Sequence, residues 1–238
     1  MTFRAYRAVP FSHAHENRIF NRLHDILLAH WGDQDEPLHL LGNFYVDGSE
    51  IDALVVKRNA LIVIDFKDYG GKLSFSENAR WKIDGKEVRG GNKTNPYQQI
   101  RDNKFQLLNY LKNKIDFQSS PNLGHIAGLC LFHQEVEFDE ADLPHNISRW
   151  FHISDISSAI RSVDAIVSAE IKFSNSDIDA LISSLDVPDY HPDGRPNEVP
   201  LPSYEGDEPL DDEFLNTEQT LALVKIKDWF EDNVNKVF

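Results

Sequence analysis

The spacing of apolar residues predicts a helix followed by three strands in the first part of the chain. Between residues 13 and 31, apolar side chains recur every three or four positions, as they do along one face of a helix. Three shorter apolar runs follow, each bounded by Gly, Asn or Asp, and this pattern is typical of strands. They predict strands at about 38–46, 50–58 and 60–67.

The same patterns continue to residue 185. A polar and apolar alternation at 72–89 predicts a hairpin that turns at Asp84-Gly85. Asn95-Pro96 predicts the start of a helix through Lys114, because proline is favoured in the first helical turn. Further strands are predicted at 125–133 and 149–153, and further helices near 155–169 and 175–185. Helices and strands in this order around one core predict an α/β fold with a central mixed sheet flanked by helices.

Residues 186–213 have a different composition. They contain 6 of the 11 prolines, and 10 acidic residues against the single base Arg195. Such a segment has few apolar side chains to bury, so we expect an extended or disordered linker. The predicted organisation is therefore a folded domain at 1–185, a linker at 186–213 and a helical segment at 214–238.

Charge is distributed unevenly along the chain, which has 238 residues and a formal net charge of −15. Residues 1–120 contain 17 Lys and Arg against 15 Asp and Glu, whereas residues 121–238 contain 7 against 24. Nucleic-acid binding requires positive charge near phosphates. The first part of the chain remains compatible with a nucleic-acid partner, and the second part does not.

Cysteine usage and hydropathy restrict the compartment. Cys130 is the single cysteine, so the chain forms no internal disulfide and offers no paired cysteines to a zinc ion. No apolar run approaches the roughly 20 residues of a membrane span, and no signal peptide is recognisable. The ten histidines lack the spacing of a zinc site. We expect a cytoplasmic protein with no membrane partner.

One strand contains two opposite charges. Asp65 and Lys67 lie two residues apart in the apolar run 60–67, so both side chains point to the same face of the predicted strand. Buried charges are costly unless they are paired or bind a metal. If the preceding strand is a neighbour, Asp52 would converge on Asp65, and a Mg²⁺ ion would relieve the repulsion between the carboxylates. An ion pair and a metal site are both open at this point.

An ordered series of residues resembles the nuclease-related domain (NERD) of the PD-(D/E)xK nuclease superfamily. The series comprises Glu16 in the first helix, Asp52 in GSEIDALVV, and Asp65 and Lys67 in LIVIDFKDYGGKL. WKIDGK follows, and NPYQQ then places Gln99 at the head of a helix. The matching segments lie in order across residues 11–112.

The resemblance implies a restriction-endonuclease-like core and a set of catalytic roles. It implies that Asp52 and Asp65 bind Mg²⁺ or Mn²⁺ and that Lys67 is the catalytic lysine. It further implies that Glu16 and Gln99 are supporting or metal-shell groups, with Glu16 counted among the metal residues. Two positions depart from the family pattern: Ile51 replaces a proline, and Asp65 replaces the more frequent glutamate. The shorter acid shifts the ligand oxygen by about one methylene group, which affects the spacing around the metal.

Basic residues in the predicted hairpin are candidates for phosphate contacts. They outnumber the acids of the same segment, and Trp81 lies among them. In the alternative interpretation, this is a solvated hairpin face with Trp81 packed inward. The candidate nucleic-acid-binding residues are Lys72, Arg80, Lys82, Lys86, Arg89 and Lys93.

The C-terminal segment LNTEQTLAL resembles the Q motif that opens superfamily 1 helicases. The resemblance implies that Gln219 would contact the adenine of ATP, with a helicase module beyond Phe238 or on another chain. No phosphate-binding loop follows within the sequence. An amphipathic helix with no helicase role is the alternative.

These patterns favour one function over two rivals. The first hypothesis is a metal-dependent DNA endonuclease or nickase domain, coupled to a helicase in DNA processing or anti-phage defence. The second is a nucleic-acid-binding module without catalysis. The third is a protein-interaction domain whose acidic half recruits a basic partner.

Overall fold

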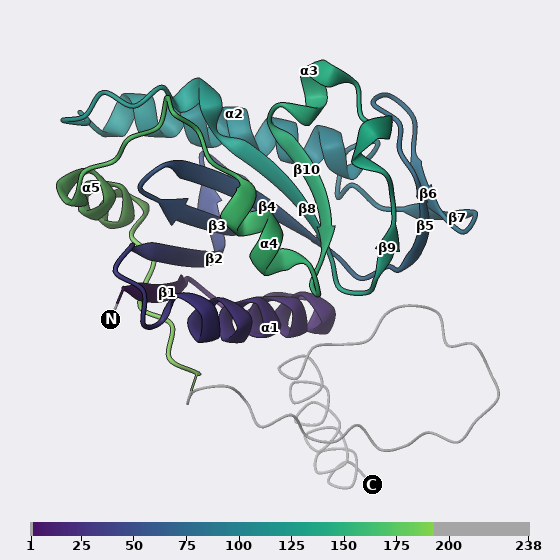
Figure 1. The fold of residues 1–238 in the computed structure, drawn as a ribbon, viewed down its shortest axis with the longest axis horizontal. Coiled ribbons are helices and arrows are strands. Elements are labelled where there is room, and N and C mark those ends of the chain that lie inside the picture. Colours follow the sequence, from purple (N-terminus) through teal and green to yellow (C-terminus); the bar gives the residue numbers. More distant parts are fainter. Residues whose placement is uncertain (1, 193–238) are drawn as a thin grey trace, which may run out of the picture.

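A six-stranded mixed sheet forms the centre of the computed structural model, which describes residues 2–192 (Figure 1). Strands β2, β3 and β4 form an antiparallel meander, while β1 pairs in parallel with β2, and β8 pairs in parallel with both β4 and β10. The mixed α/β architecture predicted from the sequence is confirmed. In order across the sheet, the strands are β1 (Phe3–Arg7), β2 (Leu38–Val46), β3 (Ser49–Lys57), β4 (Ala60–Lys67), β8 (Ala127–Phe132) and β10 (Phe151–Asp155).

Helices cover both faces of this sheet. Along β4, Ile62 and Ile64 join the core that contains α1 (Ala14–Trp31) and α4 (Ala159–Ala165). The alternate residues Leu61 and Val63 join the core that contains α2 (Pro96–Lys114) and α5 (Asn175–Leu185). This alternation explains why β4 is apolar along its whole length. Within the described part of the chain, no helix is long and apolar enough to cross a membrane.

A smaller sheet extends from one end of the main sheet (Figure 1). It contains, in order, β7 (Lys86–Val88), β6 (Trp81–Ile83), β5 (Gly71–Ser74) and β9 (Val136–Glu137). The β6–β7 hairpin turns at Asp84 (φ 47°) and Gly85 (φ 83°), as predicted, and two successive positive φ angles suit the twist of a two-residue hairpin. Short helical segments complete the fold at Leu123–His125, Glu140–Asp142 and α3 (His145–Ser148).

Several elements differ from the sequence prediction. The sequence pattern did not predict β1, β9 or α3, which are five residues long or shorter. Helix α4 begins at Ala159 and not near 155, because the Asp155 carboxylate accepts hydrogen bonds from the backbone N–H groups of Ser157 and Ser158 and forms a turn first.

The ordered chain continues past residue 185. The N–H of Tyr190 donates to the Ala5 carbonyl at 2.8 Å, and the N–H of Arg7 donates to the Pro188 carbonyl at 3.0 Å. The first residues of the predicted linker therefore pack along the free edge of β1. The rest of the predicted linker and the predicted C-terminal helix with Gln219 lie outside the described residues.

Candidate active site

A cavity of about 290 Å³ lies where β4 ends and α1 begins. Strands β4 and β8 are parallel, so their carboxyl ends meet at the same edge of the sheet, which is the usual ligand site of α/β sheets. Glu16, Asp52, Asp65, Lys67 and Gln99, the five residues that the sequence singled out, all line this cavity. The remaining lining residues are Ser12, His13, Glu50 and Gly91.

A break in the β2–β3 ladder places Asp52. Gly42 pairs with Ala53 and Phe44 pairs with Ile51, so Asp52 lies opposite Asn43, whose φ is 45°. Ile51 and Ala53 pack on opposite faces of the sheet although they are two residues apart. The Asp52 carboxylate accepts a hydrogen bond from the Phe66 N–H at 2.7 Å, beyond the last β3–β4 pair. This bond orients the carboxylate towards the end of β4.

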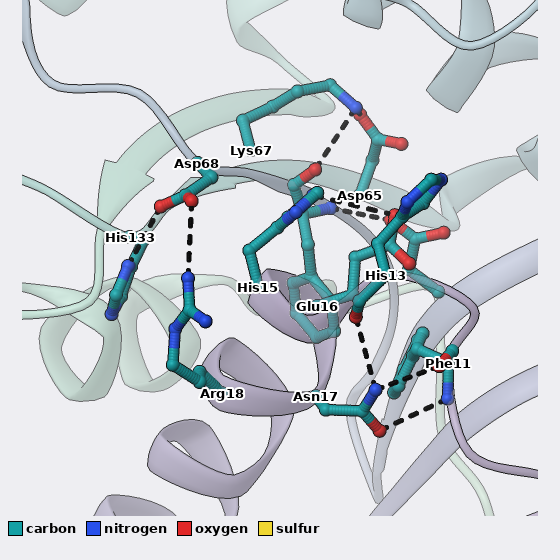
Figure 2. Close-up of polar contacts among 12 residues, drawn as sticks. Phe11, His13, His15, Glu16, Asn17, Arg18, Asp65, Lys67, Asp68 and His133 are labelled. Atoms are coloured by element: carbon teal, nitrogen blue, oxygen red, sulfur yellow. Dashed lines mark hydrogen bonds and ion pairs between the residues drawn. The ribbon is translucent and has the colours of Figure 1, made fainter. Parts of the chain in front are cut away.

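Asp65 and Lys67 form a buried ion pair (Figure 2). Lys67 Nζ lies 2.7 Å from Asp65 Oδ2, and the residues are 9% and 5% exposed. Lys67 Nζ also donates to the Phe66 carbonyl at 3.1 Å. The structure thus contains the ion pair that the strand pattern suggested, and the pair also lines the cavity. An ion pair between Asp65 and Lys67 is therefore compatible with a metal site at the same cavity.

Burial and the charges of neighbouring groups shift the pKa values of Asp52, Asp65 and Lys67. Burial raises the pKa of Asp52 well above its ordinary value, and the neighbouring Asp65 carboxylate adds to this. Burial also raises the pKa of Asp65, although Lys67 opposes the shift. Burial alone would lower the pKa of Lys67, but the carboxylates of Asp65 and Asp52 outweigh it and raise that pKa above its ordinary value. Lys67 is therefore a cation at neutral pH.

Glu16 faces the same electrostatic environment from α1. Burial raises the pKa of Glu16, while His13 and Lys67 oppose the shift and the nearby Glu50 and Asp65 carboxylates add to it. Four carboxylates around one small cavity repel one another, and a cation would relieve that repulsion.

Gln99 occupies the first turn of α2. The side chain of Asn95 caps this helix by accepting the Gln98 N–H at 2.9 Å, and its amide also donates to three carbonyls of the loop before β6. Gln99 Oε1 is buried without a hydrogen-bond donor, whereas the buried Asp65 Oδ2 has Lys67 Nζ at 2.7 Å. An unsatisfied oxygen in a cavity lined by carboxylates suits a site for a cation or for water molecules.

The oxygen donors of the cavity suit a Mg²⁺ ion that keeps part of its water shell. Among residues 2–192, no three His, Cys, Asp or Glu side chains are assembled closely enough to form a metal cage. Mg²⁺ usually keeps several waters and binds one or two carboxylates. Asp52 and Asp65 are two carboxylates on the same cavity, so they would suit such an ion, and the cavity leaves space for its waters.

The structure places the six predicted phosphate-contacting residues at the surface of the small sheet and of the loop that follows it. Two of them already have acidic partners: Arg80 lies 2.6 Å from Glu87, and Lys93 lies 2.6 Å from Asp102. Trp81 is 0% exposed and donates from Nε1 to the Ser76 carbonyl at 2.7 Å. Trp81 therefore packs inward, as in the alternative interpretation, and cannot stack on a nucleobase.

Sequence reasoning missed two titratable residues of the cavity. Glu50 precedes Asp52 by two positions, so the strand period could have identified it. His13 is the N-cap residue of α1, and it is one of the ten histidines whose spacing does not suit a zinc site. Neither residue was predicted at this site.

Comparison with known proteins identifies the family. The nuclease-related domain (NERD) family matches residues 12–133, slightly more than half of the chain, and the matched region includes all five predicted site residues. No curated protein and no solved structure gives a significant match. The match ends before the segment that resembles a Q motif, so that resemblance stays a prediction. The chain belongs to the nuclease-related domain family.

Proposed function

We propose that this chain is a Mg²⁺-dependent DNA nuclease that hydrolyses phosphodiester bonds as an endonuclease or nickase. The observation that carries the proposal is the convergence of Glu16, Asp52, Asp65, Lys67 and Gln99 on one cavity. They come from α1, β3, β4 and α2, which are far apart in the sequence. Family membership also supports a nuclease-related function.

Asp52 and Asp65 would hold the metal ion, with Glu16 completing the site directly or through water. A bound Mg²⁺ or Mn²⁺ would lower the pKa of a coordinated water and neutralise charge on the phosphoryl oxygens. The hydrogen bond from the Phe66 N–H fixes the Asp52 carboxylate, so this ligand is oriented before any metal binds.

Lys67 would stabilise negative charge and would not act as a base. Its pKa is raised by Asp65 and Asp52, so Nζ already carries its proton and cannot accept one from water. An ammonium group in a buried site stabilises the additional charge of the phosphorane-like transition state strongly. Nζ pairs with Asp65 at the wall of the cavity, where it would lie close to a phosphate bound there.

Gln99 would position the attacking water. Its buried Oε1 has no hydrogen-bond donor, and it lies beside Gly91, whose φ of 60° keeps the loop close to α2. A water molecule at Gln99 would satisfy this acceptor and would be held at the wall of the cavity.

A cleavage assay tests the proposed function. Supercoiled plasmid and single-stranded DNA are incubated with the full chain in Mg²⁺, Mn²⁺ or EDTA, and the products are resolved on gels. We expect cleavage with either metal, none in EDTA and none with Asp65→Ala. Asp35→Ala, which removes an exposed carboxylate in the α1–β2 loop, serves as the control and should cleave normally.

The alternative functions give distinct results in the same assay. A binding module without catalysis would retain DNA but release no product with either metal. A protein-interaction domain would not bind DNA even at low ionic strength, where electrostatic attraction is strongest. Helicase association and a role in defence rest only on the resemblance of residues 214–238 to a Q motif.

A further inference from the structure

A second polar cluster lies directly beside the cavity (Figure 2). Asp68 follows Lys67 in the chain, and its carboxylate contacts two basic side chains from different parts of the fold. Arg18 Nη2 of α1 lies 3.6 Å from Asp68 Oδ2, and His133 Nδ1 lies 2.9 Å from Asp68 Oδ1. None of these three residues was among the sequence-predicted site residues.

The fold fixes the position of this cluster relative to Lys67. Strands β4 and β8 are parallel, with Lys67 opposite Phe132, and the His133 N–H donates to the Lys67 carbonyl at 2.8 Å. His133 and Asp68 are therefore the first residues beyond two adjacent strand ends. His15 borders both the cluster and the cavity (Figure 2), because it lies between Arg18 and the cavity residues of the first turn of α1, with its Nε2 3.9 Å from Glu16 Oε1.

The guanidinium group of Arg18 has N–H donors available for an anion. A guanidinium group has five N–H donors, and its planar shape suits a phosphate group. The Arg18 side chain is 48% exposed, and its contact with Asp68 is long for an ion pair. Among the described residues, Asp68 is the acid that pairs with it. One carboxylate shared by Arg18 and His133 orients both side chains and leaves most of the guanidinium donors to solvent.

We propose that Arg18, together with His133, binds the backbone phosphate adjacent to the scissile phosphate, on the α1 side of the cavity. Asp68 is the positioning residue for both. The position of the cluster supports this arrangement, because Asp68 directly follows the cavity residue Lys67 at the end of β4, and Arg18 lies two positions after the cavity residue Glu16 on α1. This inference rests on the proposed function and adds a subsite to it.

A salt titration of DNA binding tests the subsite. The full chain is titrated in EDTA, which prevents cleavage, against fluorescein-labelled single-stranded and duplex DNA at about 50 to 200 mM salt. Arg18→Ala should weaken binding several-fold at low salt. It should also reduce the slope of log K against log salt by about 0.7 for single strands or about 0.9 for duplex, as expected for one lost phosphate contact.

Matched variants separate the subsite from general effects of charge. Arg22→Ala removes an exposed arginine one helical turn further along α1 and should leave the slope unchanged. Arg18→Lys keeps the charge and should retain the slope, with weaker binding. His133→Gln should weaken binding less than Arg18→Ala. Unchanged thermal unfolding of Arg18→Ala excludes a folding defect.

The possible failures are distinguishable. If wild type cleaves DNA in Mg²⁺ but Arg18→Ala and Arg22→Ala have the same slope and affinity as wild type, the subsite is refuted and the nuclease stands. If wild type neither binds nor cleaves DNA, the proposed function itself fails.

Discussion

Lys67 Nζ lies 2.7 Å from Asp65 Oδ2 on the face of β4 that borders the cavity, and the Asp52 carboxylate adds a second negative charge to the same cluster. One lysine thus compensates two buried carboxylates. An ion pair buried in this way is weak support for stability, because removing the charges from water costs about as much as their attraction returns. The arrangement is better explained by the chemistry it can perform than by the stability it provides.

The first prediction concerns Lys67→Met, which keeps the length and removes the charge. We expect DNA cleavage to fall by at least about a hundredfold, the usual loss when a group that stabilises transition-state charge is removed. The free energy of unfolding should fall by about 3 kcal/mol, because the carboxylates lose their counter-ion. Cleavage rates and urea denaturation measure the two effects.

Lys57→Met is the matched control for that variant. Lys57 is also a buried lysine, but its Nζ donates to the Val163 carbonyl at 2.6 Å, at the end of α4 and away from the cavity. This substitution should lower stability while leaving the cleavage rate of the folded protein unchanged. Equal loss of cleavage in both variants would count against a catalytic Lys67.

The second prediction concerns Asp52→Asn and pH. Burial and Asp65 raise the pKa of Asp52 in the folded protein, so above about pH 4 the folded state binds more protons here than the unfolded state. Stability must therefore fall as pH rises through that window. Asp52→Asn can still accept the Phe66 N–H, but it carries no charge. We expect a higher melting temperature at pH 7 than wild type and little difference near pH 4.

The effect of Mg²⁺ on the melting temperature tests whether Asp52 is a metal ligand. If Asp52 binds the metal, millimolar Mg²⁺ should raise the melting temperature of wild type more at pH 8 than at pH 6, since the metal competes with protons for the carboxylates. Asp52→Asn should lose this response. The same Mg²⁺ response in both proteins would show that Asp52 is not a ligand.

Local sequence patterns predicted the main helices and strands, because these patterns depend only on residues that are close together in the chain. The continuous apolar run of β4 and the Asn95-Pro96 start of α2 need no tertiary information. Strand β1 could not be predicted, since its five residues are stabilised by β2 on one side and by residues 188–190 on the other. Tertiary contacts of this kind leave little trace in a local pattern.

The candidate site was also predictable only in part. The order of Glu16, Asp52, Asp65, Lys67 and Gln99 identified the residues through the family resemblance, and the structure gathers them around one cavity. Asn43 has a positive φ, and the β2–β3 pairing is interrupted where it lies opposite Asp52. This interruption orients Asp52 towards β4, and the sequence pattern does not predict it. The Asp68 cluster depends on the register of β4 against β8, a relationship between segments 65 residues apart.

The third prediction concerns the hairpin. Lys82 and Lys86 are exposed and have no ion-pair partner among the described residues, whereas Arg80 is bound to Glu87. If the hairpin contacts phosphates, Lys82→Ala with Lys86→Ala should weaken DNA binding several-fold and reduce its salt dependence. The double variant Arg80→Ala with Glu87→Ala keeps the net charge and should change neither. Identical salt slopes in all three proteins would exclude hairpin contacts.

The fourth prediction concerns Lys104, a buried lysine without an acidic ion-pair partner among the described residues. Its Nζ lies 4.3 Å from the centre of the Trp150 ring, and burial lowers its pKa to about 8. Between pH 8 and about 10.4 the unfolded chain binds more protons here, so stability should rise with pH across that range. Lys104→Met should therefore stabilise the protein by about 3 kcal/mol at pH 7, with the gain fading towards pH 10. Thermal unfolding beside the exposed Lys112→Met measures it, and a pH-independent gain would contradict the explanation.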